Sequence, residues 1–341
     1  MDRTAISTAQ ERAQLFKAVE ARHTHRIHAA IIEKDFWVCW TLHRIFEVLR
    51  FRPQLIFKGG TSLSKVYNAI ERFSEDVDLS LSRRDLGFAD DRDPEQPSIS
   101  KTEAKRRLNE LVAECRCVIR DRLLPELRAD FATVLGSERW TVELDADDPQ
   151  TILFAYPKSD MEYGLGTYMR PAIRLEMGAR SDDWPTVEGE IMPYAAEVFP
   201  QAFTTARACR VHTLEAARTF WEKATLLHAE THRPPDKPCR ERLSRHYYDL
   251  YRLSQQDIGR DALARGDLLD RVIQHKSFFF AQSWAHYDTA RPGSFRLLPS
   301  AERLETLRAD YTAMNPMIFG KCPEWNEIVR GLKQLEKAIN A

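Results

Sequence analysis

One stretch of sequence indicates both the fold and the chemistry of this chain: KGGTSL at residues 58–63, followed by RFSEDVDLSL at residues 72–81. A short apolar run, QLIF, precedes the double glycine, and EDVDLSL alternates polar and apolar residues with a period of two. Alternation of this kind is typical of a strand with one buried face, and a glycine pair is typical of a tight turn. The stretch therefore predicts strand, turn, helix and strand, in that order.

Two carboxylates share one face of the second predicted strand. Asp76 and Asp78 are two residues apart, and the apolar Val77 and Leu79 point the other way. Like charges this close repel each other, and a hard divalent cation bound between them relieves that repulsion. The pair predicts a metal site, and Mg²⁺ is its natural occupant.

The double glycine adds a candidate phosphate-binding turn. Gly59 and Gly60 carry no side chains, so backbone N–H groups can approach an anion there, and Thr61 and Ser62 add hydroxyl donors. Each feature alone has a simpler interpretation, since Gly-Gly before Thr-Ser often makes only a turn and D-x-D often occurs on solvated strands. Together, in this order and spacing, they predict metal-assisted phosphoryl or nucleotidyl transfer.

Around this stretch the sequence predicts an α+β fold in three parts. A helical segment at 1–50 precedes a domain at 51–205 with a mixed β-sheet flanked by helices, and an all-helical domain at 206–341 follows. Further strands are predicted in WTVEL, TILFAYP, RPAIRLEMGAR and the extended VEGEIMPY, and none after Phe203. A helix broken near Pro125 is predicted over 101–128.

The composition is that of a globular protein without a global basic field. The net charge is −1, with 50 Lys and Arg against 51 Asp and Glu, and 43% of the residues are hydrophobic. No apolar run approaches the roughly 20 residues of a membrane span, and the N-terminus lacks an apolar signal core. The six cysteines form no C-x-x-C pair and predict reduced thiols without a disulfide framework or a zinc site. We therefore expect a cytoplasmic protein without membrane association.

The motifs resemble those of the AbiEii/AbiGii-type nucleotidyltransferase toxin family, a branch of the polymerase-β-like nucleotidyltransferase superfamily. The resemblance rests on K-G-G-T-S-L and R-x-S-E-D-x-D-L and covers most of residues 30–255. Three further segments resemble the helical lead-in and the later lysine and aspartate motifs of the family: Glu33-Lys34-Asp35-Phe36-Trp37-Val38, Thr219-Phe220-Trp221-Glu222-Lys223-Ala224 and Tyr247-Tyr248-Asp249-Leu250-Tyr251.

The resemblance implies roles for individual residues. Asp76 and Asp78 would be catalytic metal ligands, joined by a third carboxylate from a later strand, for which Glu176 is the candidate and Glu143 the rival. Lys223 and Asp249 would also be catalytic. The implied nucleotide-binding residues are Lys58, Gly59, Gly60, Thr61, Ser62, Ser74 and Lys223.

Ordinary structural roles compete with several of these assignments. Glu176 or Glu143 could be an exposed strand carboxylate, and Lys223 could be a surface lysine whose stem lies on an apolar helix stripe. Asp249 follows Arg245 at helical i+4 spacing, which fits a simple ion pair. Basic residues concentrate at 105–107 and 231–245, where they could contact a phosphate backbone or form a solvated helix face.

The activity that the resemblance implies is transfer of a nucleoside monophosphate from an NTP to an acceptor hydroxyl, with release of pyrophosphate. The implied cofactor is Mg²⁺, as one or two ions, and the implied acceptor is RNA, in particular tRNA. The implied role is that of the toxin in a toxin–antitoxin or phage-defence system, with a cognate antitoxin as partner. Two alternatives use the same parts: an ATP-dependent kinase acting on a protein or small molecule, and a non-catalytic nucleotide-binding module.

Overall fold

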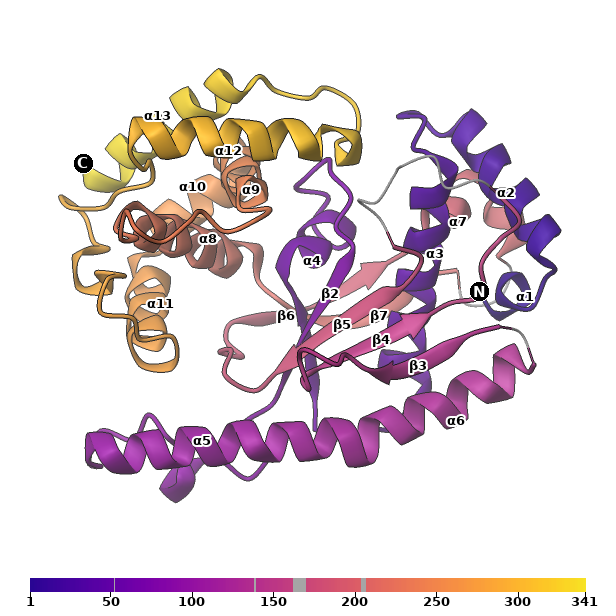
Figure 1. Cartoon of the computed structure of the whole chain (residues 1–341), viewed down its shortest axis with the longest axis horizontal. Helices are drawn as coiled ribbons and strands as arrows, with labels where there is room; N and C mark the ends of the chain where they lie inside the picture. Colours follow the sequence, from indigo (N-terminus) through magenta and orange to yellow (C-terminus); the bar gives the residue numbers. More distant parts are fainter. Residues whose placement is uncertain (52, 138, 162–169, 204–206) are drawn as a thin grey trace. The chain divides into compact units, whose positions relative to one another are not determined.

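A computed structural model describes the chain from residue 1 to 341, apart from residues 52, 138, 162–169 and 204–206. The chain divides into two compact units. The first unit comprises Met1–Val66 and Phe73–Thr213, and the second comprises Tyr67–Arg72 and Leu214–Ala341. The short segment Tyr67–Arg72, which links KGGTSL at 58–63 to the strand that carries Asp76 and Asp78, thus belongs with the C-terminal helices (Figure 1).

The first unit is built on a seven-stranded mixed sheet in the order β3-β4-β5-β2-β1-β7-β6. β1 runs antiparallel to β2 and parallel to β7, and β2 runs parallel to β5. The mixed sheet of the predicted fold class is confirmed. The strands are β1 (Leu55–Lys58), β2 (Asp76–Leu81), β3 (Thr141–Leu144), β4 (Thr151–Ala155), β5 (Ile173–Gly178), β6 (Thr186–Ile191) and β7 (Cys209–Leu214).

One strand contradicts the sequence prediction. No strand was expected after Phe203, yet Cys209–Leu214 forms β7 and pairs with β1 through Phe57 and Thr213. The buried positions in it are Cys209, Val211, Thr213 and Leu214, and two of them, Cys209 and Thr213, are small and weakly hydrophobic. Their alternation is too faint to indicate a strand in isolation, and the neighbouring strand β1 stabilises it through tertiary pairing.

Helices cover the apolar face of the sheet. α3 is buried along its whole length, and Trp37 and Trp40 of this helix contact Phe154 of β4 at ring-centroid distances of 5.9 Å. Phe131 of α6 joins the same aromatic cluster. The helices of this unit are α1 (Asp2–Ala5), α2 (Ala9–Arg22), α3 (Ala29–His43), η1 (Arg44–Val48), α4 (Gly59–Lys65), η2 (Asp90–Arg92), α5 (Lys101–Val118), η3 (Ile119–Leu123), α6 (Leu124–Leu135), α7 (Tyr194–Val198) and η5 (Pro200–Ala202).

The helix predicted over 101–128 is present, but it is not broken at Pro125, because helical structure continues to Leu135 (Figure 1). α5 ends at Val118, five residues of π-helix follow, and α6 begins with Pro125 in its first turn. The helix departs from α geometry in the π-helical turn directly before Pro125, a residue that has no N–H to donate within the helix. Among the described residues, no helix combines the length and hydrophobicity needed to cross a membrane.

The second unit is helical, as the sequence predicted for the C-terminal region. α9 packs against α8, α10, α12 and α13. The segment 67–72 joins these helices through hydrogen bonds from Gln256 Nε2 to the carbonyl of Ala69 and from the Phe319 N–H to the carbonyl of Glu71, both 2.7 Å long. The helices of the second unit are α8 (Ala216–Thr231), α9 (Ser244–Ser254), α10 (Asp257–Ala264), α11 (Gly266–Phe279), η6 (Tyr287–Thr289), α12 (Ala301–Met314), η7 (Asn315–Met317) and α13 (Trp325–Asn340).

His228 of α8 is held as a neutral imidazole inside this unit. Its Nδ1 accepts a 3.0 Å hydrogen bond from the backbone N–H of Arg296, so Nε2 carries the proton and donates to the His286 carbonyl at 3.1 Å. Burial lowers the pKa of His228 from 6.5 to about 4, because a second proton would add a buried charge and remove the Arg296 bond.

We therefore expect the free energy of unfolding to fall as the pH drops below 6.5. Between pH 6.5 and about 4 the unfolded chain binds a proton at His228 and the folded chain does not, at a cost of about 1.4 kcal/mol per pH unit. Urea unfolding at pH 7 and pH 5 measures the difference. His228→Gln should reduce this pH dependence, and His25→Gln, at an exposed position, should not; equal pH dependence in both variants would contradict the assignment.

Candidate active site

Two neighbouring strands place Asp76, Asp78 and Glu176 together on one face of the sheet. In the parallel register of β2 and β5, Asp78 is the partner of Glu176, and Asp76 is the partner of Arg174. Partner residues on adjacent strands point to the same side, about 4.8 Å apart. The alternate residues Val77, Ile173 and Leu175 are fully buried on the opposite face. The sequence pattern thus produces a row of carboxylates backed by the hydrophobic core.

The register also distinguishes the two candidates for the third carboxylate. Glu176 is on β5, directly beside β2, whereas Glu143 is on the edge strand β3. Three strand spacings, about 14 Å in total, separate β3 from β2. The geometry therefore favours Glu176 as the carboxylate that acts with Asp76 and Asp78.

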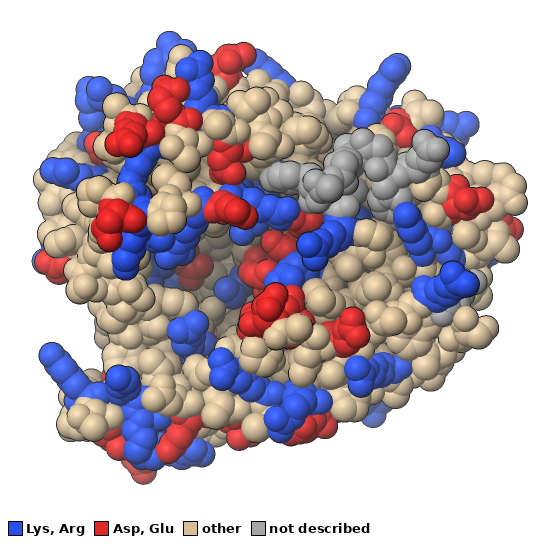
Figure 2. Space-filling view, in the orientation of Figure 1, with Lys and Arg blue, Asp and Glu red and all other residues tan. Residues whose placement is uncertain are grey.

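The charges of this row interact strongly. Burial raises the pKa of Glu176, and the negative charges of Asp76 and Asp78 raise it further. The guanidinium of Arg174 lies beside the row, with Nε 3.4 Å from Glu176 and 3.9 Å from Asp76. Figure 2 shows acidic side chains gathered over the strands of the first unit, with basic side chains next to them. Carboxylate oxygens in such a repelling group fit the ligand preference of Mg²⁺.

Gly59 allows one of these carboxylates to approach the turn after β1. Its φ is +79°, and a Cβ added to it would lie 1.9 Å from Oδ2 of Asp78. Any side chain at this position would collide with the carboxylate and would also adopt an unfavourable left-handed backbone conformation. The first glycine of the pair is thus required by the packing of Asp78 against the backbone.

Replacing Gly59 with alanine should displace Asp78 and lower the melting temperature. The positive φ alone costs about 1–2 kcal/mol for a non-glycine residue, and the overlap with Asp78 adds to that cost. Gly266→Ala is the matched control, because a Cβ at the start of α11 meets nothing within 4 Å. Thermal unfolding of both variants tests this, and a Gly59→Ala protein as stable as Gly266→Ala would contradict it.

The remaining predicted nucleotide-binding residues divide into two sets. Lys58, Gly59 and Gly60 are partly exposed, and Lys58 is the strand partner of Asp78. Thr61, Ser62 and Ser74 are buried.

The buried hydroxyl of Thr61 connects the KGGTSL motif to the RFSEDVDLSL motif. Thr61 donates to the backbone carbonyls of Ser74 and Asp76, and Ser62 donates to the carbonyl of Gly59 at 3.0 Å. These bonds fix the turn and helix α4 against the start of β2, where the carboxylates lie. The hydroxyls of Thr61 and Ser62 therefore stabilise the backbone around the carboxylates.

The segment Glu33-Lys34-Asp35 of α3 holds the same region in place through buried polar contacts. Lys34 Nζ lies 2.9 Å from Glu75, the residue before β2, and Asp35 pairs with Lys65 of α4 at 2.8 Å. Glu33 accepts a 2.7 Å hydrogen bond from the backbone N–H of Ser159. The charged residues of this motif therefore position the ends of β2 and α4.

The second unit contains a separate buried cluster centred on Asp249 of α9. Arg72 binds both carboxylate oxygens of Asp249 at 2.7 and 2.8 Å, and Lys223 Nζ of α8 lies 2.8 Å from Oδ2. The side chain of Asp249 is inaccessible to solvent. Its partners come from 177 and 26 residues away, so the simple pairing with Arg245 considered from the sequence does not describe its main contacts.

The charges in this cluster follow from its burial. Burial alone would raise the pKa of Asp249, but Arg72 and Lys223 outweigh it and hold the pKa far below its usual range. Burial lowers the pKa of Lys223 against the attraction of Asp249. Burial and the charge of Lys223 lower the pKa of His246, whose Nδ1 lies 3.4 Å from Lys223 Nζ and acts as an acceptor. Asp249 thus serves here as the counter-ion that orients two buried cations.

A protein-family model matches most of the chain. The family model described as "Nucleotidyl transferase AbiEii toxin, Type IV TA system" matches residues 40–331, more than four fifths of the chain. The chain belongs to the AbiEii nucleotidyltransferase toxin family. The resemblance inferred from the sequence is confirmed, and the protein is a nucleotidyltransferase toxin of a type IV toxin–antitoxin system.

Solved structures include a similar chain, MenT4, a nucleotidyltransferase toxin from Mycobacterium tuberculosis. The sequence identity is 16%, the alignment covers 96% of this chain and 97% of MenT4, and the TM-score is 0.45. No curated protein matches the sequence.

Three residues of this AbiEii protein were given no role from the sequence alone. Arg72 is the first residue of the R-x-S-E-D-x-D-L motif, and Arg174 alternates with Glu176 on β5. Both therefore lie in segments from which the sequence already predicts site residues. His246 had no such signal, because its contact with Lys223 depends on how α8 and α9 pack. Only tertiary structure assigns these contacts.

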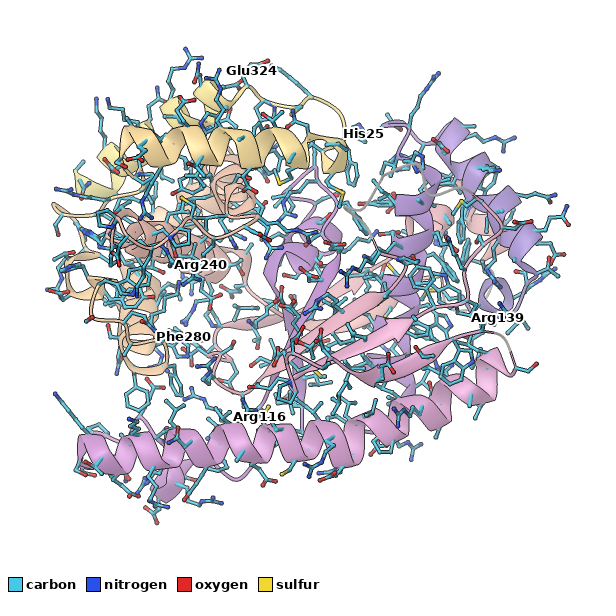
Figure 3. All side chains as sticks on the ribbon, in the orientation of Figure 1. His25, Arg116, Arg139, Arg240, Phe280 and Glu324 are labelled. Atoms are coloured by element: carbon cyan, nitrogen blue, oxygen red, sulfur yellow. The ribbon has the colours of Figure 1, made fainter. Side chains whose placement is uncertain are left out.

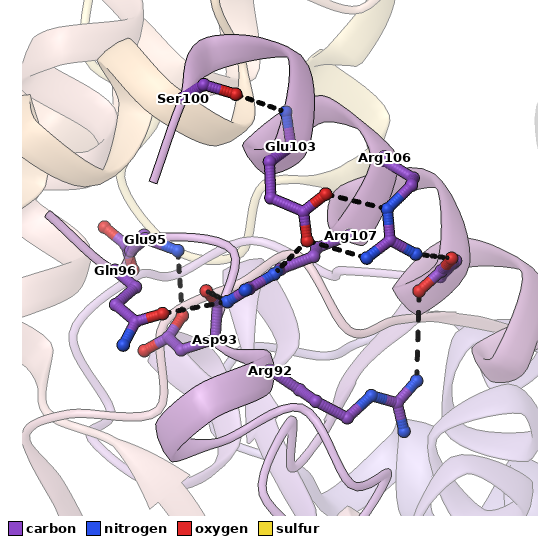
Figure 4. Close-up of polar contacts among 9 residues, drawn as sticks. Arg92, Asp93, Glu95, Gln96, Ser100, Glu103, Arg106 and Arg107 are labelled. Carbon is purple, nitrogen blue, oxygen red and sulfur yellow. Dashed lines mark hydrogen bonds and ion pairs between the residues drawn. The ribbon is translucent and has the colours of Figure 1, made fainter. Parts of the chain in front are cut away.

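In both basic concentrations, arginine side chains already pair with carboxylates. Figure 4 shows that Arg106 and Arg107 of α5 both pair with Glu103, at 2.6 and 2.7 Å. In the second unit, Arg240, marked in Figure 3, pairs with Glu230 at 3.2 Å. A phosphate backbone would have to compete with these carboxylates at both places.

Proposed function

We propose that this AbiEii toxin transfers a nucleoside monophosphate from an NTP to an acceptor hydroxyl and releases pyrophosphate. The observation that carries the proposal is the register that places Asp76, Asp78 and Glu176 side by side on β2 and β5. These three carboxylates would hold Mg²⁺, one or two ions, which when bound supplies charge neutralisation for the reacting phosphates and acidifies the attacking hydroxyl.

The predicted nucleotide-binding residues of each unit have distinct tasks in this proposal. Lys58, next to Asp78 in the sheet, and the partly exposed Gly59 and Gly60, through their backbone, bind the phosphates of the NTP. Thr61 and Ser62 hold the turn in shape through their hydrogen bonds to backbone carbonyls. In the second unit, Lys223 is the proposed phosphate-binding cation, and Asp249 keeps it charged and oriented.

RNA, in particular tRNA, is the proposed acceptor. The loop between α8 and α9 supports this choice, because Arg233 and Lys237 lie 5.3 and 5.9 Å from the ring centroid of Trp284. An aromatic ring beside cations suits an RNA strand, whose bases stack and whose phosphates attract positive charge. The family also makes a cognate antitoxin the proposed protein partner.

The proposal is tested by incubating purified protein with Mg²⁺, total RNA and each α-³²P-labelled NTP in turn. The expected result is label on a tRNA-sized band with one or more nucleotides, together with stoichiometric pyrophosphate. A variant with Asp76→Ala and Asp78→Ala should transfer no label.

A parallel series with γ-³²P-ATP separates the kinase alternative. Label from the γ-phosphate with release of ADP would contradict nucleotidyl transfer and indicate phosphotransfer. Label from the α-phosphate on protein or on a small molecule would retain the reaction and overturn the RNA acceptor. No label on any acceptor, with folded protein and metal present, would favour a non-catalytic nucleotide-binding module.

A further inference from the structure

A group of three metal-ligating side chains lies apart from the carboxylate row. His43 ends α3, Glu47 lies in the π-helical turn η1 one turn later, and Cys209 begins β7. One ligand atom from each, a ring nitrogen, a carboxylate oxygen and the thiol sulfur, all lie within 4.8 Å of one another. The nucleotidyl transfer reaction proposed above assigns no role to these residues.

The sheet register separates this group from the carboxylates. Thr213 of β7 is level with Phe57 of β1, and Asp78 is level with Lys58, the next residue. Cys209 precedes Thr213 by four residues, about 13 Å along the strand. The group therefore lies at the opposite end of the strands from the proposed magnesium ligands.

His43 has an unsatisfied nitrogen in this group. Its side chain is only 10% exposed, and Nδ1 lies 3.1 Å from Oε2 of Glu47 yet makes no hydrogen bond of acceptable geometry. A buried ring nitrogen that faces a carboxylate without a hydrogen bond is unfavourable, and a cation shared by the two atoms removes that penalty.

Glu47 and Cys209 are positioned by the backbone of β7. The second carboxylate oxygen of Glu47 accepts a 2.7 Å hydrogen bond from the N–H of Arg210, which leaves Oε2 directed at His43. Cys209 is buried, and its thiol donates a 3.4 Å hydrogen bond to the carbonyl of Arg210. Glu47 also borders an open hollow that is lined by Glu188, Arg210 and His212, so water has access to the group.

We propose that His43, Glu47 and Cys209 bind a Zn²⁺-class transition-metal ion that ties the end of α3 to the start of β7. One nitrogen, one oxygen and one sulfur ligand match the donor atoms of zinc, and water from the hollow completes four-coordination. The thiol donor disfavours Mg²⁺ and so separates this site chemically from Asp76, Asp78 and Glu176. Binding converts the Cys209 thiol to a thiolate and releases its proton to solvent. The sequence did not indicate this site, because no C-x-x-C pair marks it.

Cobalt(II) titration of the metal-free full-length protein tests the proposal. One equivalent of Co²⁺ should produce a thiolate-to-cobalt charge-transfer absorption, and stoichiometric Zn²⁺ should abolish it. Cys209→Ser should lose this band, and Glu47→Gln, whose side chain is 31% exposed, should weaken Co²⁺ binding at least about tenfold. Cys115→Ser is the matched control, because Cys115 is equally buried in the same unit.

The Asp76→Ala, Asp78→Ala variant distinguishes this site from the proposed reaction centre. It should keep the full cobalt band, whether or not the wild-type protein transfers nucleotides. Absence of the band in the wild type, its persistence in Cys209→Ser, or its loss in Cys115→Ser would each overturn the proposal.

Discussion

Replacing Asp78 with asparagine is expected to reduce nucleotidyl transfer about 10³-fold or more while the protein remains folded. A bound metal ion contributes several kcal/mol to the stabilisation of the transition state, and each 1.36 kcal/mol is a factor of ten in rate. Asparagine keeps the shape of the side chain and removes the charge that the metal requires. The measurement is the rate of label transfer at saturating Mg²⁺ and NTP.

The melting temperature of the same variant is the control for this prediction. Asp78 raises the pKa of Glu176 by charge repulsion, so removing its charge relieves strain in the folded state. We therefore expect Asp78→Asn to be at least as stable as the wild type, as happens where function and stability conflict. Wild-type activity in the variant, or activity lost only through unfolding, would contradict the proposed role of Asp78.

Replacing Asp249 with asparagine is expected to destabilise the protein by about 3–5 kcal/mol. Two buried cations, Arg72 and Lys223, would then lie close together without a counter-ion, and removing one partner of a buried ionic cluster typically has a cost of this size. Urea unfolding measures the loss.

A surface ion pair of the same segment provides the matched control. Glu71, the residue before Arg72, lies 3.1 Å from Arg252 of α9, and both side chains are substantially exposed. Glu71→Gln should therefore lower the free energy of unfolding by about 1 kcal/mol or less. Equal effects of Glu71→Gln and Asp249→Asn would contradict the view that the Asp249 cluster is an internal support of the second unit.

The sequence was most informative where local pattern determines structure. The alternation around Asp76 and Asp78 correctly predicted a strand, and AIRLEMG correctly predicted a strand that carries Glu176 on its polar face. Patterns of period two specify which residues share a face, and they need no knowledge of the neighbouring strands. The fold class follows from such patterns, whereas the family was inferred from the resemblance of the motifs.

What the sequence could not predict depends on register and long-range packing. Both Glu176 and Glu143 lie on strands, and only the strand order shows which of them neighbours Asp78. The partner of Asp249 is Arg72 rather than a residue of its own helix, and the two are 177 residues apart in the chain. Such pairings have no local signal, because loop length and hydrophobic pattern do not determine which polar side chains meet.

A matched pair of variants tests whether the carboxylate row on β2 and β5 is the catalytic metal site. Glu176→Gln and Glu143→Gln make the same chemical change on two strands of one sheet. Glu176 is on β5, directly beside β2, and Glu143 is on β3, three strand positions away from β2. The measurement is the initial rate of label transfer from the α-labelled NTP, with melting temperatures recorded for both proteins. We expect the rate to fall at least about 10²-fold in Glu176→Gln, two or more steps of 1.36 kcal/mol, and to stay within about twofold of wild type in Glu143→Gln. A folded Glu176→Gln protein with wild-type activity, or a larger loss in Glu143→Gln, would show that the row does not hold the catalytic metal.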